Sequence, residues 1–174
     1  MSNVSDEIFY LIQDKEVKIR GRYLRFSANV EGLMAKCIIL LNEAKIKTSG
    51  IETKIDLKNF MFRQKLDKFQ SLLIELYPDL SESYSTIFEH IDAFRKLRNK
   101  MAHCYFTWDE SDLMSVTIWD FDETSDPPII KPTKYTLEQI SNSLTQSIKD
   151  IMYDLNSLAT KVIERVKPLI PHMF

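Results

Sequence analysis

The segment that decides the fold is AFRKLRNKMAHCYF, residues 93–106. Apolar side chains recur at intervals of three and four before and within it, which places them on one face of a helix. They are Ile87, Phe88, Ile91, Phe94, Leu97 and Met101. This pattern stops near His103, so we expect a helix over about 82–102, capped by Ser81, with basic and amide groups at its carboxyl end.

Within this segment, Arg98 is followed by Asn99, by His103 and then by Tyr105. The spacing resembles the arginine-x4-histidine-x-tyrosine motif of the HEPN superfamily, in the form seen in HEPN toxins that are paired with nucleotidyltransferase antitoxins. The resemblance is carried by this segment and by a general helical character. It implies an up-and-down antiparallel helical bundle, cleavage of RNA, and a homodimer that brings two copies of the motif into one cleft.

The residue types of the motif suit metal-independent cleavage of an RNA backbone, without a cofactor. A histidine titrates near neutral pH and can move protons between the 2′-hydroxyl and the leaving oxygen, which is the role we expect for His103. An arginine is always charged and holds two phosphate oxygens at once, which suits Arg98. Asn99 would orient the ring or the substrate. The need for a 2′-hydroxyl would select RNA over DNA.

The spacing of Arg98 and His103 raises a geometric problem. In an ideal helix, residues five apart lie about 140° apart around the axis. The helix must therefore loosen at its last turn, or one member must come from another copy of the chain. The alternative is structural: Arg98 would pair with a carboxylate, and His103 would cap the final carbonyl groups of the helix.

Further candidates surround the motif. Arg95, Lys96 and Lys100 would contact the RNA backbone, or would form an ordinary solvated charged face. Tyr105 is a regulatory candidate, because the resemblance implies that an antitoxin modifies this tyrosine with a nucleotide and thereby blocks the site. Otherwise Tyr105 would be the first residue of a strand that packs against the helices.

Composition narrows the class of protein. A length of 174 residues suits one domain, which we expect over 1–174. Three glycines argue against glycine-rich phosphate loops, and a net charge of −2 requires any nucleic-acid site to be a local basic patch. Two cysteines and the lack of any metal-ligand spacing predict neither a disulfide framework nor a metal site. Without a secretory leader or a long apolar run, we expect a soluble cytoplasmic protein with no membrane association.

The remaining chain predicts an all-α fold with a small β-hairpin inserted after the motif helix. We expect helices over 5–12, 17–44 and 59–77, with a loop over 45–58 and a stop at Pro78. The hairpin pairs 105–108 with 115–121 through a turn at 109–112. A proline-containing loop covers 123–134, and Thr136 with Gln139 begins a final helix that extends to about Val166.

These patterns predict a metal-independent endoribonuclease of the HEPN type that acts as a homodimer, as the toxin of a toxin–antitoxin or phage-defence system. The alternative is a HEPN-like helical module that binds RNA, a nucleotide or a protein partner and does not cut.

Overall fold

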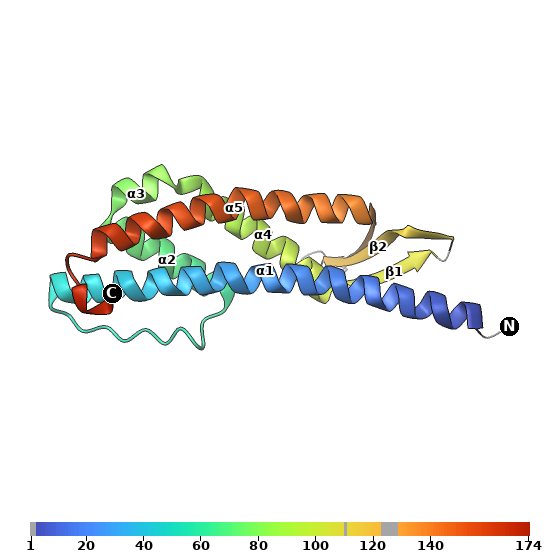
Figure 1. Ribbon diagram of the computed structural model, residues 1–174, viewed down its shortest axis with the longest axis horizontal. Helices are drawn as coiled ribbons and strands as arrows, with labels where there is room; N and C mark the ends of the chain where they lie inside the picture. The colour runs from blue at the N-terminus through green and yellow to red at the C-terminus, as the bar shows by residue number, and fades with distance from the viewer. Residues whose placement is uncertain (1–2, 110, 123–128) are drawn as a thin grey trace. The chain divides into compact units, whose positions relative to one another are not determined.

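The computed structural model describes residues 3–109, 111–122 and 129–174. Its elements, in chain order, are α1 (Asn3–Ser49), α2 (Phe62–Leu76), α3 (Pro78–Ser83), α4 (Ser85–His103), β1 (Tyr105–Asp109), β2 (Asp112–Asp122), β3 (Ile129–Thr136), α5 (Leu137–Val166) and a 3₁₀ turn (Pro171–Met173) (Figure 1). The described chain is therefore mostly helical, with helices that pack together and one antiparallel sheet. The expected all-α fold with a small β-hairpin is thus confirmed in its mostly helical character, but the chain is not purely all-α, because the sheet has three strands.

The chain divides into two compact units, and α1, α4 and α5 contribute residues to both. The first unit contains Met1–Phe26 and Lys96–Gln146, and the second contains Ser27–Arg95 and Ser147–Phe174. The expectation of one domain over 1–174 stays a prediction.

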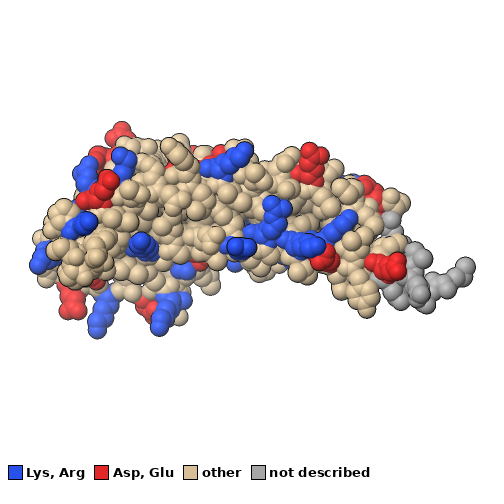
Figure 2. Space-filling model, viewed as in Figure 1, with Lys and Arg blue, Asp and Glu red and all other residues tan. Residues whose placement is uncertain are grey.

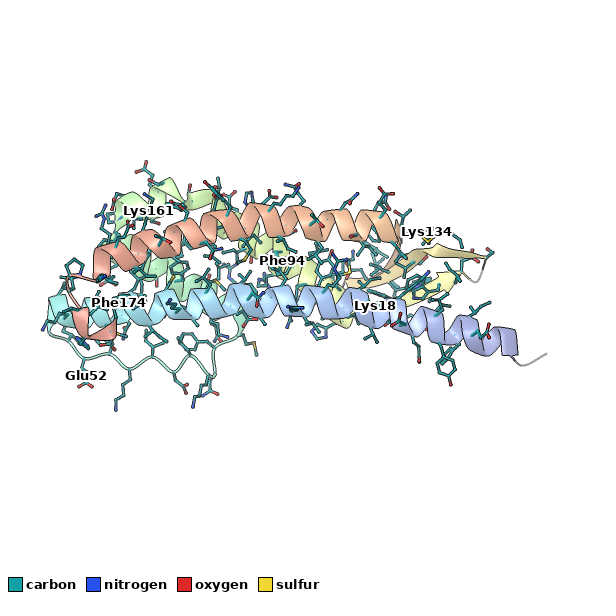
Figure 3. The ribbon with its side chains drawn as sticks, in the orientation of Figure 1. Lys18, Glu52, Phe94, Lys134, Lys161 and Phe174 are labelled. Atoms are coloured by element: carbon teal, nitrogen blue, oxygen red, sulfur yellow. The ribbon has the colours of Figure 1, made fainter. Side chains whose placement is uncertain are left out.

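The second unit consists of packed helical segments. Phe69 and Phe88 bring α2 and α4 together, with ring centroids 5.6 Å apart. Phe94, labelled in Figure 3, is 1% exposed. The most completely buried members of this core include Val30, Met34, Ile38, Leu41, Leu73, Ile87, Ile91, Leu155, Leu158, Val162 and Val166. The repeat of three and four in α4 thus predicted the buried face correctly except at Leu97, which is only half-buried.

The first unit contains the sheet, whose strand order is β1-β2-β3. The β1–β2 hairpin matches Tyr105 with Trp119 and Phe106 with Ile118, which confirms the expected pairing of these segments. Phe106, Val116 and Ile118 are buried, because period-two alternation directs these residues to the covered face.

The third strand corrects the loop expected over 123–134. Residues 129–136 form β3, which pairs antiparallel with β2, while 123–128 lie outside the described residues. Pro132 stands opposite Trp119 in this strand. A proline donates no backbone hydrogen bond, but an edge strand needs donors on one side only. Pro132 is therefore compatible with a strand, and reading it as a sign of a loop was wrong.

Two helix boundaries also differ from expectation. Residues 5–12 and 17–44 belong to one helix, α1, because 13–16 contains no helix breaker and carries two ion pairs at a spacing of four, Asp14–Lys18 and Glu16–Arg20. This helix ends before Gly50, whose φ of 70° suits glycine.

The predicted start of the motif helix was also wrong. Ser81 does not cap the motif helix but lies inside α3, which begins at Pro78, a residue well suited to a first helical turn.

By contrast, the predicted start of α5 is confirmed. The Thr136 amide donates to Gln139 Oε1 at 2.8 Å, and the Gln139 amide donates to Thr136 Oγ1 at 3.1 Å. Within the described ranges, no helix has the length and apolar character needed to cross a bilayer.

Candidate functional site

The motif residues occupy the last turns of α4 and the start of β1, all in the first unit except Arg95. The helix does not loosen before its end, because residues through His103 are helical and the Cys104 amide still donates to the Lys100 carbonyl at 3.0 Å. Arg98 and His103 therefore keep the separation of about 140° that an ideal helix imposes. In one chain these two side chains leave the helix in different directions.

The carboxyl end of α4 is held by Arg20, a residue of α1. Its Nη1 donates to the carbonyl oxygens of Met101 at 2.7 Å and Ala102 at 2.9 Å, and its Nη2 donates to that of Cys104 at 2.9 Å. The last carbonyl groups of a helix have no partner within the helix, and a positive charge there is favourable. Arg20 thus satisfies the groups that His103 was expected to cap in the structural alternative.

Two further contacts fix Arg20 itself. Glu16 accepts a hydrogen bond from Arg20 Nε at 2.8 Å and lies 2.7 Å from Nη2. The guanidinium also stacks over the Phe106 ring, 4.3 Å from its centroid. Because Phe106 is buried in β1, one arginine connects α1, the end of α4 and the sheet of this unit.

His103 lies on the exposed side of this clamp. Its side chain is exposed, and among the described residues nothing accepts from or donates to its imidazole. The backbone on either side is held by Arg20, so the ring is presented to solvent from a fixed position. This is the arrangement that a proton-transfer group needs before a substrate arrives.

Arg98 is half-buried, and its Nη1 donates to the Oδ1 of Asn99 at 3.0 Å. Its Nε is buried without a hydrogen-bond partner in the described part of the chain. No carboxylate there pairs with it, so the ion pair of the structural alternative is not seen. A buried donor without a partner costs about 1–3 kcal/mol.

Lys100 belongs to a small polar cluster on the sheet side of α4. Its Nζ lies 2.9 Å from Asp120 Oδ2 and 6.0 Å from the centroid of Tyr135. Burial by itself lowers the pKa of Lys100, but the hydrogen bond and negative charge of Asp120 more than offset this, so the pKa is raised overall. Lys100 is therefore already engaged by protein groups.

Cys104 shares Asp120 with Lys100. The thiol lies 3.6 Å from Asp120 Oδ1, and burial together with the nearby carboxylate raises the pKa of Cys104. A thiol under these conditions is protonated near neutral pH and is a poor nucleophile. Cys104 is thus a structural member of the site.

The other candidates lie in different settings. Arg95 belongs to the second unit, where its Nε donates to Asp92 Oδ1 at 2.9 Å, and Arg63 binds the same oxygen. Lys96 is exposed in the first unit. Tyr105, the first residue of β1, has 66% of its surface exposed and is accessible to a modifying enzyme.

The sequence did not reveal Arg20 or Asp120 as parts of this site. Arg20 is about eighty residues from the carbonyl groups that it binds, and the local pattern around it predicts only an ion pair with Glu16. Asp120 follows Trp119 in a strand pattern that gives no reason to single it out. Both assignments depend on which elements pack together.

Comparison with known proteins does not add to this geometry, because no family model, curated protein or solved structure matches the chain. Across residues 3–109, 111–122 and 129–174, no three side chains of His, Cys, Asp or Glu converge so that they could hold a metal ion.

Proposed function

We propose that this chain is a metal-independent endoribonuclease of the HEPN type whose active site is formed by two copies of the chain. The observation that carries the proposal is the end of α4, where Arg98 has an unpartnered buried donor beside Asn99 and where His103 stands exposed on a clamped backbone. The mostly helical character of the chain agrees with the bundle that the resemblance implies. The up-and-down order of its helices is part of the same proposal.

The direction of the two side chains supports a shared site. Because α4 is regular through His103, Arg98 and His103 of one chain do not face one point. A twofold axis near the end of α4 would bring Arg98 of one copy toward His103 of the other. It would also supply two histidines, one as the base and one as the acid, and would double the local positive charge.

The chemistry then follows from the residue types. One His103 removes the proton of the 2′-hydroxyl, whose oxygen attacks the adjacent phosphorus, and the other His103 protonates the departing 5′-oxygen. Arg98 holds the phosphate oxygens as negative charge accumulates on them, and Asn99 keeps the guanidinium in place. The products are a 2′,3′-cyclic phosphate and a free 5′-hydroxyl.

Cleavage of RNA in the presence of EDTA tests this function. The wild-type chain should cut RNA but not DNA, and Arg98→Ala and His103→Ala should each lower the rate by at least about a hundredfold. His90→Ala and Arg25→Ala are matched controls, since both side chains are exposed and lie outside the motif. RNA binding without cleavage would instead identify the non-catalytic module.

A mixing experiment tests the shared site directly. Because the proposed cleft uses His103 of both copies, a dimer of one wild-type chain and one His103→Ala chain should be inactive. After random exchange of subunits in an equal mixture, activity should fall to about a quarter of that of wild-type protein at the same total concentration, since only a quarter of the dimers are fully wild type. If each chain cuts RNA by itself, the mixture keeps about half of the activity.

The biological role that we propose is that of a toxin in a toxin–antitoxin or phage-defence system. The exposure of Tyr105 supports control by an antitoxin that attaches a nucleotide to the phenol. Such a group would add negative charge and bulk next to the RNA-binding surface. Tyr105→Phe should cut RNA normally and should resist inhibition by a cognate nucleotidyltransferase, whereas equal inhibition of both proteins would exclude this tyrosine.

A further inference from the structure

A cavity of about 270 Å³ lies in the first unit between α1 and the beginning of α5. Each helix presents one face to it, with residues spaced by three and four. The lining residues are Lys15, Lys18, Ile19, Arg22 and Tyr23 of α1 and Leu137, Ile140, Ser141 and Leu144 of α5. The motif residues are not among them, so this cavity is separate from the proposed ribonuclease site.

The cavity has an apolar floor and a basic rim. Its aliphatic and aromatic side chains form most of the wall, and Lys15, Lys18 and Arg22 bring positive charge from one helix. None of the lining residues is acidic. Figure 2 shows lysine and arginine side chains gathered over α1 on the face turned toward the viewer, and Figure 3 labels Lys18 on that helix.

The basic groups are only partly engaged. Lys15 donates to the Leu113 carbonyl at 2.7 Å, and Lys18 donates to Asp14 at 2.6 Å. Arg22 has a long contact of 3.5 Å with Ser141 Oγ, the weakest of the three. Each ammonium group carries three donors and a guanidinium carries five, so donors are left for an anion, and Arg22 is the best placed to use them.

The side chains behind the rim are buried and uncharged. Tyr23 is 1% exposed, and its hydroxyl donates to the Ile140 carbonyl at 3.2 Å, which ties α1 to α5 at the base of the cavity. Ile140 and Leu144 are also buried. A ligand body that lies against these groups must itself be apolar, because the wall offers it little to hydrogen-bond with.

We propose that this cavity binds a small amphipathic monocarboxylate, with its apolar body between α1 and α5 and its carboxylate at Arg22 and Lys18. The size of the cavity supports a ligand of this kind. A cavity of about 150 Å³ holds one benzene molecule, so a cavity of this volume suits a ligand of roughly ten non-hydrogen atoms. Octanoate has the required size, apolar chain and single negative charge.

Calorimetric titration of the full chain with octanoate tests the proposal, with 1-octanol as the uncharged comparison. Octanoate should bind at one saturable site per chain, and 1-octanol should bind about tenfold more weakly or worse, because it cannot form charge-assisted hydrogen bonds with the rim. Equal affinity for the two compounds, or no saturable binding of octanoate, would overturn the proposal.

Two pairs of variants locate the site. Arg22→Gln should weaken octanoate binding about tenfold, while Arg25→Gln, on an exposed position of the same helix, should leave it unchanged. Ser141→Phe should block the cavity, while Asn142→Phe, its exposed neighbour outside the lining, should not. If the two glutamine variants change the affinity for octanoate equally, and the two phenylalanine variants also do so, octanoate binds elsewhere. Ribonuclease activity is not needed for any of these measurements, so the two proposals stand or fall separately.

Discussion

Arg20 donates a hydrogen bond from Nη1 to the backbone carbonyl oxygen of Met101 at 2.7 Å, although the two residues are 81 positions apart in the chain. Through this bond and its neighbours, α1 holds the end of the helix that carries the motif. The relationship makes the candidate site dependent on a residue outside the motif.

Removal of this arginine should destabilise the chain. Arg20→Ala leaves carbonyl groups of α4 and the Glu16 carboxylate without their partner, so we expect a loss of about 2–3 kcal/mol in the free energy of unfolding. Urea denaturation followed by circular dichroism measures it. Arg25→Ala, on an exposed position of the same helix, should cost less than about 0.5 kcal/mol. Similar losses for the two variants would contradict the clamp.

Asn99 should act as a positioning residue for Arg98. Asn99→Ala removes the acceptor for Arg98 Nη1, so the guanidinium loses its fixed direction. We expect the rate of RNA cleavage to fall between about tenfold and a hundredfold, with a larger effect on kcat than on KM. Asn142→Ala, at an exposed position of α5, is the control. Unchanged kcat in Asn99→Ala would remove this role.

The buried thiol of Cys37 should make stability fall in alkaline solution. Burial raises the pKa of Cys37 from 9.0 to about 12. Above pH 9 the unfolded thiol loses a proton that the folded thiol keeps, so the stabilisation present below pH 9 is lost as the pH rises toward 12. This contributes up to about 1.4 kcal/mol per pH unit. Denaturation between pH 8 and 10.5 should show a shallower decline in Cys37→Ala than in wild type; parallel curves would refute the assignment.

Asp120 should control the reactivity of Cys104. Burial and the Asp120 charge both raise the pKa of this thiol, so Asp120→Asn should lower it and increase the thiolate fraction at a given pH. Alkylation by iodoacetamide at pH 8 should therefore accelerate, by up to about tenfold per unit of pKa. The control is Asp109→Asn, at an exposed position of β1. If both variants react at the wild-type rate, Asp120 does not govern the thiol.

The hydrogen bonds that cap the start of α5 should make a measurable contribution to the free energy of unfolding. Thr136→Ala removes the acceptor for the Gln139 amide and should destabilise the chain by about 1 kcal/mol, and Thr136→Ser should restore most of this. Thr145→Ala, within the same helix, should be neutral or slightly stabilising because alanine favours helix. A loss in Thr145→Ala as large as that in Thr136→Ala would mean that the cap contributes nothing specific.

The local elements of this protein were largely predictable. The buried face of α4, the β1–β2 hairpin, the stop before Pro78 and the cap formed by Thr136 and Gln139 each depend on residues within a few positions of one another. Errors occurred where a local signal allowed more than one outcome. The polar residues 13–16 suit a loop or an exposed turn of helix, and Pro132 suits a loop or an edge strand.

The candidate site likewise has features that the sequence predicted and features that depend on the tertiary structure. The sequence by itself determined which groups are available, namely an arginine, an amide, an imidazole and a phenol at the end of an amphipathic helix, because residue types and spacing are properties of the chain. Only the tertiary structure decided that Arg20 binds the end of α4, that Asp120 engages Lys100 and Cys104, and that Arg98 Nε is buried without a partner. The physical reason is that hydrogen bonding and desolvation act between atoms that are close in space, and folding brings together residues that the sequence keeps far apart.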